Sequence, residues 1–128
     1  MDLDLDVDLD LVYAARVNFR KLEVYQAAVR FLPLAVAIAD SLPPRYATLG
    51  DQLRRASISI PLNIAQGSGK SMRPDQRRYY AIARGSAMEC AAILDACRAL
   101  MLTEKTKCEE ADRLLLSVVR MLFKICPV

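Results

Sequence analysis

The sequence predicts an all-α fold, an antiparallel up-and-down four-helix bundle. Apolar residues recur three or four positions apart in four long segments, which is the spacing of amphipathic helices. Proline or glycine separates these segments, and the connections between them are short, as in bundles whose successive helices run antiparallel. We expect two parts, an acidic extension over residues 1–16 and the bundle over residues 17–128.

The first helix is expected over residues 18–42, with Asn18 as its cap. Pro33 lies well inside this segment, where its missing N–H and its ring predict a kink near residues 29–33. Pro43 and Pro44 end the helix, because the residue before a proline disfavours the α conformation.

The second helix is expected to begin at Thr48, with Asp51 completing a variant of the capping box, and to end at the Gly67-Ser68-Gly69 segment. Its apolar residues fall on two opposite faces. One face carries Leu49, Leu53, Ala56, Ile60 and Ile64, and the other carries Ile58, Leu62 and Ala65. A helix that is apolar on both faces needs two partners, so we expect the second face to contact another copy of the chain.

The third helix is expected to be capped by Ser71 or Arg73, to hold Pro74 in its first turn and to reach about Leu102. A broad, mostly apolar arc contains Tyr79, Ile82, Ala83, Ser86, Cys90, Ile93, Leu94 and Cys97. A separate stripe, predicted to lie well away from this arc, contains Arg73, Arg77, Tyr80 and Arg84. Glycine inside a helix costs ~1 kcal/mol relative to alanine, so Gly85 predicts close approach of a neighbouring backbone.

The fourth helix is expected to open at Thr106, which forms a capping box with Glu109. Its apolar stripe runs from Cys108 to Ile125. With 54% hydrophobic residues in 128, the chain has more apolar side chains than one core of this size requires. The excess favours a homo-oligomer.

The formal net charge of +3 conceals a strong asymmetry. Five of the fifteen acidic residues lie at positions 2, 4, 6, 8 and 10, whereas all 18 basic residues lie beyond position 11. Residues 1–11 alternate acidic and apolar side chains, which is the period of a strand. This segment is either a solvated tail or leader, or an edge strand that pairs with another copy. Its charge would also shield a basic surface in the absence of an anionic partner.

Basic residues gather in the middle of the chain, where seven of them and a single acid, Asp75, lie between Arg54 and Arg84. Guanidinium groups bind phosphates and a tyrosine ring stacks on a base, so this pattern favours binding of RNA or DNA. The expected nucleic-acid-binding residues are Arg54, Arg55, Lys70, Arg73, Arg77, Arg78, Tyr80 and Arg84.

Three alternatives remain open for this basic region. Its residues are ordinary solvated charges, or they dock the acidic surface of a partner protein, or the bundle binds a small ligand in a sizeable internal pocket. The oligomer interface is expected at Ile58, Leu62 and Ala65 in each case.

Catalysis, a metal and a cofactor are not expected. The chain has no histidine, which removes the usual base for a serine or cysteine nucleophile and a ligand of di-metal bundle sites. The GSGK segment ending at Lys70 lacks a full phosphate-binding loop and follows a helix instead of a strand. The four cysteines form no CxxC pair, so we expect reduced, core-packing thiols. No export signal or membrane-spanning run is visible, which favours the cytoplasm.

The run QLRRASISIPLNIAQGSGK, together with YYAIARGSAMEC and FRKLEVYQAA, resembles the small four-helix-bundle proteins known from intervening sequences of bacterial 23S rRNA genes. These are related to the accessory variability proteins of diversity-generating retroelements. The resemblance covers most of residues 19–100 and implies a homopentameric barrel with a basic surface. Retroelement members bind nucleic acid and a reverse transcriptase, which makes both possible partners of this chain. The matching positions are Arg54, Arg55, Ser59, Pro61, Asn63, Gly67, Gly85, Ser86 and Glu89, and Gln66 departs from the Glu expected in most relatives.

Overall fold

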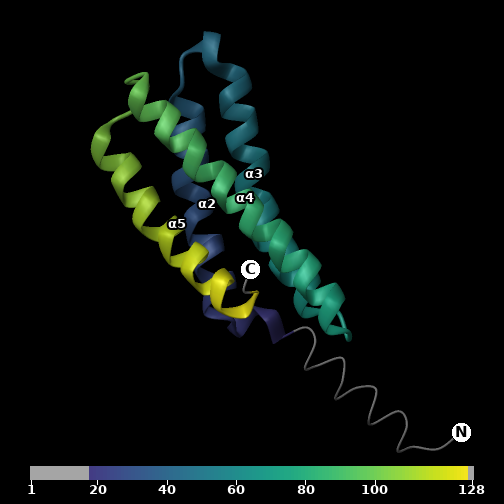
Figure 1. The fold of residues 1–128 in the computed structure, drawn as a ribbon. Helices are drawn as coiled ribbons and strands as arrows, with labels where there is room; N and C mark the ends of the chain where they lie inside the picture. Colours follow the sequence, from purple (N-terminus) through teal and green to yellow (C-terminus); the bar gives the residue numbers. More distant parts are fainter. Residues whose placement is uncertain (1–17, 127–128) are drawn as a thin grey trace, which may run out of the picture.

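The computed structural model describes residues 18–126, and all regular elements in that range are helical (Figure 1). The expected extension over residues 1–16 lies outside the described residues. Two short 3₁₀ turns, η1 and η2, precede the first two long helices. The elements are η1 (Asn18–Lys21), α2 (Glu23–Ser41), η2 (Pro44–Tyr46), α3 (Ala47–Ser68), α4 (Arg73–Ala99) and α5 (Lys105–Ile125).

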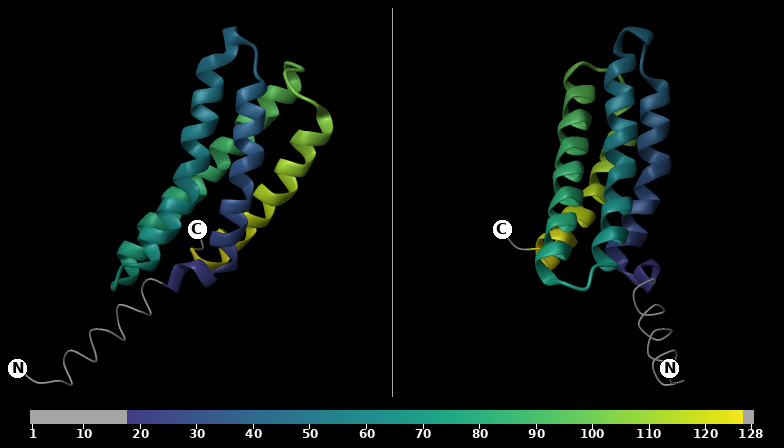
Figure 2. Two further views of the ribbon diagram at one scale, coloured as in Figure 1. Left: turned by 180° about the vertical axis from the view of Figure 1, so that it is seen from behind. Right: turned by 90° about the vertical axis from the view of Figure 1, so that its right-hand side faces the viewer.

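The four long helices form an antiparallel bundle. Helix α2 packs against α3 and α5, and α4 packs against the same two helices, so each helix has its sequence neighbours beside it. Successive helices run in opposite directions, as the views in Figures 1 and 2 show. The predicted all-α class and up-and-down bundle are therefore confirmed. No helix within residues 18–126 has the length and apolarity needed to cross a membrane.

The core lies along the bundle axis and takes side chains from all four long helices. Its largest members include Phe31 of α2 and Leu94 of α4. On α3, Leu53 and the rest of the predicted inner face lie against this core, whereas Ile58 and Leu62 are 45% and 58% exposed. The second apolar face of α3 is thus open on the single chain.

Most of the predicted apolar arc of α4 faces the core, since Ala83, Cys90, Ile93, Leu94 and Cys97 are buried. Ile82 is exposed, whereas Ala87 is fully buried and Tyr80 packs against the core. The stripe with the arginines therefore borders the core instead of lying well away from it. A small side chain explains the difference, because Ala87 carries a weak apolar signal yet allows α4 to approach its neighbours closely.

The predicted side-chain caps are absent from the four long helices, since none begins with a side-chain hydrogen bond to its first turn. Asn18 lies in η1, one turn before α2. The 3₁₀ turn η2 leads directly into α3, so the chain is already turning before Thr48. The residues that precede the four helices are Leu22, Tyr46, Met72 and Glu104, and Pro74 lies in the first turn of α4 as predicted.

Helix α4 ends at Ala99, three residues earlier than predicted. Met101 has φ 53°, in the left-handed region, and its N–H donates to the carbonyl of Arg98 at 3.1 Å. The N–H of Leu102 donates to the carbonyl of Cys97 at 2.9 Å. These two bonds form a Schellman motif, in which the left-handed position after the helix is usually taken by glycine. Methionine at this position hides the boundary in the sequence.

Glycine permits close helix contact at Gly67, whereas Gly85 shows none. A Cβ atom on Gly67 would lie 2.7 Å from Cε1 of Tyr80 and 3.2 Å from Cβ of Tyr79. A Cβ atom on Gly85 would meet no described atom within 4 Å. The close approach predicted at Gly85 is therefore wrong for the single chain. Helices α2 and α3 continue through Pro33 and Pro61, and the kink expected near residues 29–33 remains a prediction.

Polar side chains add to the α3–α4 contact. The hydroxyls of Ser59 and Ser86 lie 2.8 Å apart, and the amide of Asn63 donates to the carbonyl and the hydroxyl oxygen of Ser59 at 2.8 and 2.9 Å. Ser59 and Ser86 of the family-like motif thus link the two helices, and Asn63 holds the Ser59 hydroxyl from within α3.

Substituting the two glycines separately tests this packing. Gly67→Ala should lower the free energy of unfolding, because the added methyl overlaps the ring of Tyr80. Gly85→Ala should raise it by about 1 kcal/mol, because the position is helical and open. Urea unfolding followed by far-UV circular dichroism measures both changes. Equal changes in the two variants would contradict the assignment of the contact to Gly67.

Candidate nucleic-acid interface

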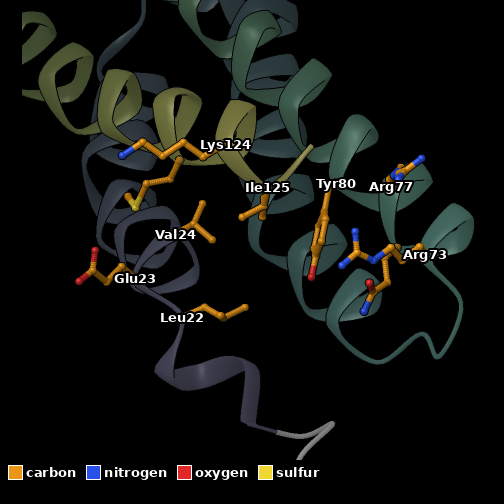
Figure 3. A pocket seen from close by; sticks show the side chains of 10 residues that line it. Leu22, Glu23, Val24, Arg73, Arg77, Tyr80, Lys124 and Ile125 are labelled. Atoms are coloured by element: carbon orange, nitrogen blue, oxygen red, sulfur yellow. The ribbon is translucent and has the colours of Figure 1, made fainter. Parts of the chain in front are cut away.

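An open pocket of about 520 Å³ lies where α2 begins and α5 ends, beside the first turns of α4 (Figure 3). Basic side chains stand on two sides of it, with Arg73 and Arg77 on α4 and Lys124 on α5. The other lining residues are Leu22, Glu23, Val24, Gln76, Tyr80, Met121 and Ile125. The pocket therefore combines an apolar lining with cations at its edge.

The pocket exists because α3 and α4 diverge from α2 and α5 toward this end of the bundle (Figure 1). Tyr80 stays with α3, since Gly67 leaves room for its ring. The hydroxyl of Ser68 donates to the carbonyl of Ile64 at 2.9 Å, so Tyr80 is the donor in the 3.1 Å hydrogen bond between the two hydroxyls. The Gln76 amide donates to the carbonyl of Lys70 at 3.1 Å and holds the α3–α4 connection.

A second hollow, of about 550 Å³, lies between α2 and α5 and shares Glu23, Met121 and Lys124 with the first. The two hollows therefore form one continuous surface. We call its cations the basic end surface, defined by Arg30, Arg73, Arg77, Arg113, Arg120 and Lys124. Glu23 is the single carboxylate among the residues that line the two hollows.

Sequence reasoning missed four members of the basic end surface. Arg113, Arg120 and Lys124 are seven and four residues apart, which places them on one face of α5. That spacing could have identified these three residues as one basic face from the sequence alone. Arg30 on α2 had no such signal, because only the packing of α2 against α5 brings it to this surface.

Arg54 serves a structural role among the expected binding residues. Its guanidinium pairs with Asp40 of α2 and, at 2.9 Å, with Asp51 of its own helix. The hydrogen bond that Arg54 donates to the carboxylate of Asp40 is the main cause that raises the pKa of Arg54 above its ordinary value. Two carboxylates thus balance this charge where α2 meets α3. Arg55 is exposed and lines neither hollow.

Lys70 and Arg78 gather around Tyr79 at the turn between α3 and α4. The ammonium of Lys70 and the guanidinium of Arg78 each lie 5.1 Å from the centre of the Tyr79 ring, which is cation–π distance. This cluster is separate from the pocket, which neither cation lines. The structure therefore separates the eight expected residues. The pocket is lined by Arg73, Arg77 and Tyr80, the turn holds Lys70 and Arg78, Arg55 is exposed by itself, and structural contacts involve Arg54 and Arg84.

Arg84, like Arg54, has a structural role. Its guanidinium donates to the carbonyl of Cys126 and lies 4.8 Å from the centre of the Phe123 ring. A carbonyl just beyond a helix end has no partner in the helix and a cation beside it is favourable, so Arg84 anchors the end of α5. The thiol of Cys126 in turn contacts the carbonyl of Arg77 at 3.5 Å.

Burial raises the pKa of the thiols of Cys90, Cys97 and Cys108 above the ordinary value. Cys90 is fully buried, and burial, with a contribution from the charge of Glu89, raises the pKa of its thiol to about 12. A thiol with so high a pKa stays protonated and is a poor nucleophile and metal ligand. Residues 18–126 also contain no group of three or more side chains suited to hold a metal ion.

The fold and the two hollows define a small helical-bundle protein with an open, basic end. The family model described as 23S rRNA-intervening sequence protein matches residues 20–124, and the chain belongs to that family. The match confirms the resemblance seen in the motifs and extends it through nearly all of α5. A comparison with curated proteins finds no match.

The structural role of Arg84 leads to a prediction about stability. Arg84→Gln should lower the free energy of unfolding by about 1–2 kcal/mol, because the carbonyl of Cys126 and the ring of Phe123 lose their cation. The matched control Arg55→Gln removes the same charge from an exposed position and should change it by less than about 0.5 kcal/mol. Urea unfolding measures both. A smaller effect at Arg84 than at Arg55 would contradict the anchoring role.

Proposed function

We propose that this protein is a non-enzymatic homo-oligomer that binds RNA or DNA through the basic end surface. The observation that carries the proposal is the charge of that surface, where six cations from three helices face a single carboxylate. Nucleic-acid backbones carry a regular series of phosphates, and binding by lysine and arginine is largely electrostatic.

The pocket adds a contact that the cations alone do not provide. The ring of Tyr80 lines it, with Arg73 and Arg77 on the same helix (Figure 3). An unpaired base stacks on such a ring while its neighbouring phosphates pair with the guanidiniums, as in other proteins that bind single strands. This arrangement favours single-stranded nucleic acid over a duplex, whose bases are already stacked.

Binding should depend steeply on salt concentration. If the six cations each neutralise one phosphate of a single strand, the logarithm of the association constant falls by about 4 per tenfold rise in salt. Fluorescence anisotropy with labelled single-stranded RNA, single-stranded DNA and an RNA–DNA hybrid, measured across a salt series, tests this. Micromolar protein that binds none of these in low salt would overturn the proposal.

The residues of the pocket can be tested by a triple substitution. Changing Arg73, Arg77 and Lys124 together to Gln should weaken single-strand binding at least 10-fold in low salt and reduce the salt slope by about 2. A control that changes Arg45, Arg55 and Lys107 to Gln removes the same charge from exposed positions outside the two hollows. Equal losses in both variants would show that only net charge matters. If the pocket variant keeps the wild-type affinity for the oligonucleotide but no longer binds an acidic partner protein, the scaffold alternative is favoured.

The outer face of α3 supports assembly from several copies. Ile58 and Leu62 are large, apolar and about half exposed, and Ala65 beside them is half-buried. Burying these side chains against another copy removes apolar surface from water, at about 25 cal/mol per Å². A homopentamer, as the family resemblance implies, would also place several basic end surfaces in one assembly. A reverse transcriptase, which retroelement members of the related proteins bind, is a possible further partner of that assembly.

Two leucines on opposite faces of α3 separate assembly from folding. Leu62→Asp should weaken the oligomer while the bundle stays folded, because its side chain is 58% exposed on the single chain. Leu53→Asp should unfold the bundle, because an unpaired carboxylate in the core costs about 3 kcal/mol or more. Light scattering reports the mass and circular dichroism reports the folding. A wild-type monomer at micromolar concentration would contradict assembly through this face.

A further inference from the structure

We propose that the acidic segment formed by residues 1–11 binds the pocket at the open end of its own bundle and keeps nucleic acid out of it. The proposal rests on the proposed function insofar as the segment competes with phosphates. The contact itself, between a segment of this chain and a pocket of this chain, is a separate claim that can be measured without nucleic acid.

Charge complementarity is the first argument. The pocket presents Arg73, Arg77 and Lys124, with Glu23 as its one acidic lining residue. The segment carries aspartate at positions 2, 4, 6, 8 and 10, and the first basic residue of the chain is Arg16. Attraction between these groups acts at short range even at physiological salt, where charges interact over about 8 Å.

Matching apolar patterns are the second argument. Apolar residues occupy the positions between the aspartates, so an extended conformation would place five carboxylates on one face and the apolar side chains on the other. The pocket has the corresponding arrangement, with cations at its edge and an apolar lining of Leu22, Val24, Met121 and Ile125. Leu22 and Ile125 are 37% and 43% exposed, so this lining is open to an occupant. A simple run of acidic residues would match the cations alone.

The position of the segment in the chain is the third argument. The described chain enters through η1 at Asn18 and reaches Leu22, which is itself part of the pocket lining. Roughly ten residues separate the acidic segment from Leu22, and a chain of that length spans about 18 Å on average. A tether this short gives an effective concentration in the millimolar range. A contact with an intrinsic dissociation constant of about 0.1 mM would then fill the pocket about 90% of the time.

The first test compares two sets of charge substitutions in the full chain. Changing Asp4, Asp6 and Asp8 to Asn should raise the affinity for labelled single-stranded RNA about 10-fold, because the pocket is freed. The matched control changes Glu104, Glu109 and Glu110 to Gln, which alters the net charge equally at exposed positions at the opposite end of the bundle. Equal gains in the two variants would overturn the proposal, because they would show an effect of net charge alone.

The second test locates the segment without nucleic acid. A photo-crosslinking amino acid in place of Leu5 in the full chain should form crosslinks to peptides that contain residues 73–80 or 121–125, identified by mass spectrometry. Added single-stranded RNA should lower their yield. Crosslinks to other parts of the bundle, or to residues 1–11 of a second copy, would overturn the proposal. Crosslinks in the pocket combined with no RNA binding by any variant would support the contact and overturn the proposed function instead.

Discussion

The open end of the bundle depends on one steric constraint, the absence of a side chain at Gly67. Without a Cβ there, the ring of Tyr80 lies against α3, and its hydroxyl donates to Ser68. Tyr80 therefore remains part of the α3–α4 pair while that pair diverges from α2 and α5 (Figure 1). The tyrosine ring, the first turns of α4 and the end of α5 then line one pocket. A larger residue at position 67 would move the ring, and with it one wall of that pocket.

Sequence patterns predicted the fold class and the two faces of α3, because large aliphatic residues there define each face unambiguously. Leu53 and Ile60 are buried and Leu62 is exposed, as expected. The same reasoning found most of the core face of α4 but left Ala87 outside it, since an alanine that permits close packing contributes little to a hydrophobic periodicity. Two helix ends were also misplaced, because the 3₁₀ turn η1 occupies the expected start of α2 and a left-handed Met101 follows an earlier end of α4.

The candidate site was harder to predict than the fold, because a charge's neighbours in the sequence are rarely its neighbours in space. Arg54 and Arg84 fall inside the basic run, yet one pairs with Asp40 and Asp51 and the other anchors the end of α5. Distant cations, among them Arg30, join Arg73 and Arg77 only through the packing of α2, α4 and α5. Sequence reasoning therefore predicted a basic surface and found only part of the residues that form it.

The bundle balances its positive charge unevenly. Asp40 pairs with Arg54 and Asp112 with Arg98, and each of these ion pairs joins two helices. At the end where α5 terminates, the two hollows hold cations with Glu23 as their one carboxylate, so the positive charge there has few internal partners. A concentrated charge of one sign attracts opposite charge from outside the bundle. Phosphates of a nucleic acid and the aspartates of residues 1–11 both carry that opposite charge, so under the two proposals above they compete for one pocket.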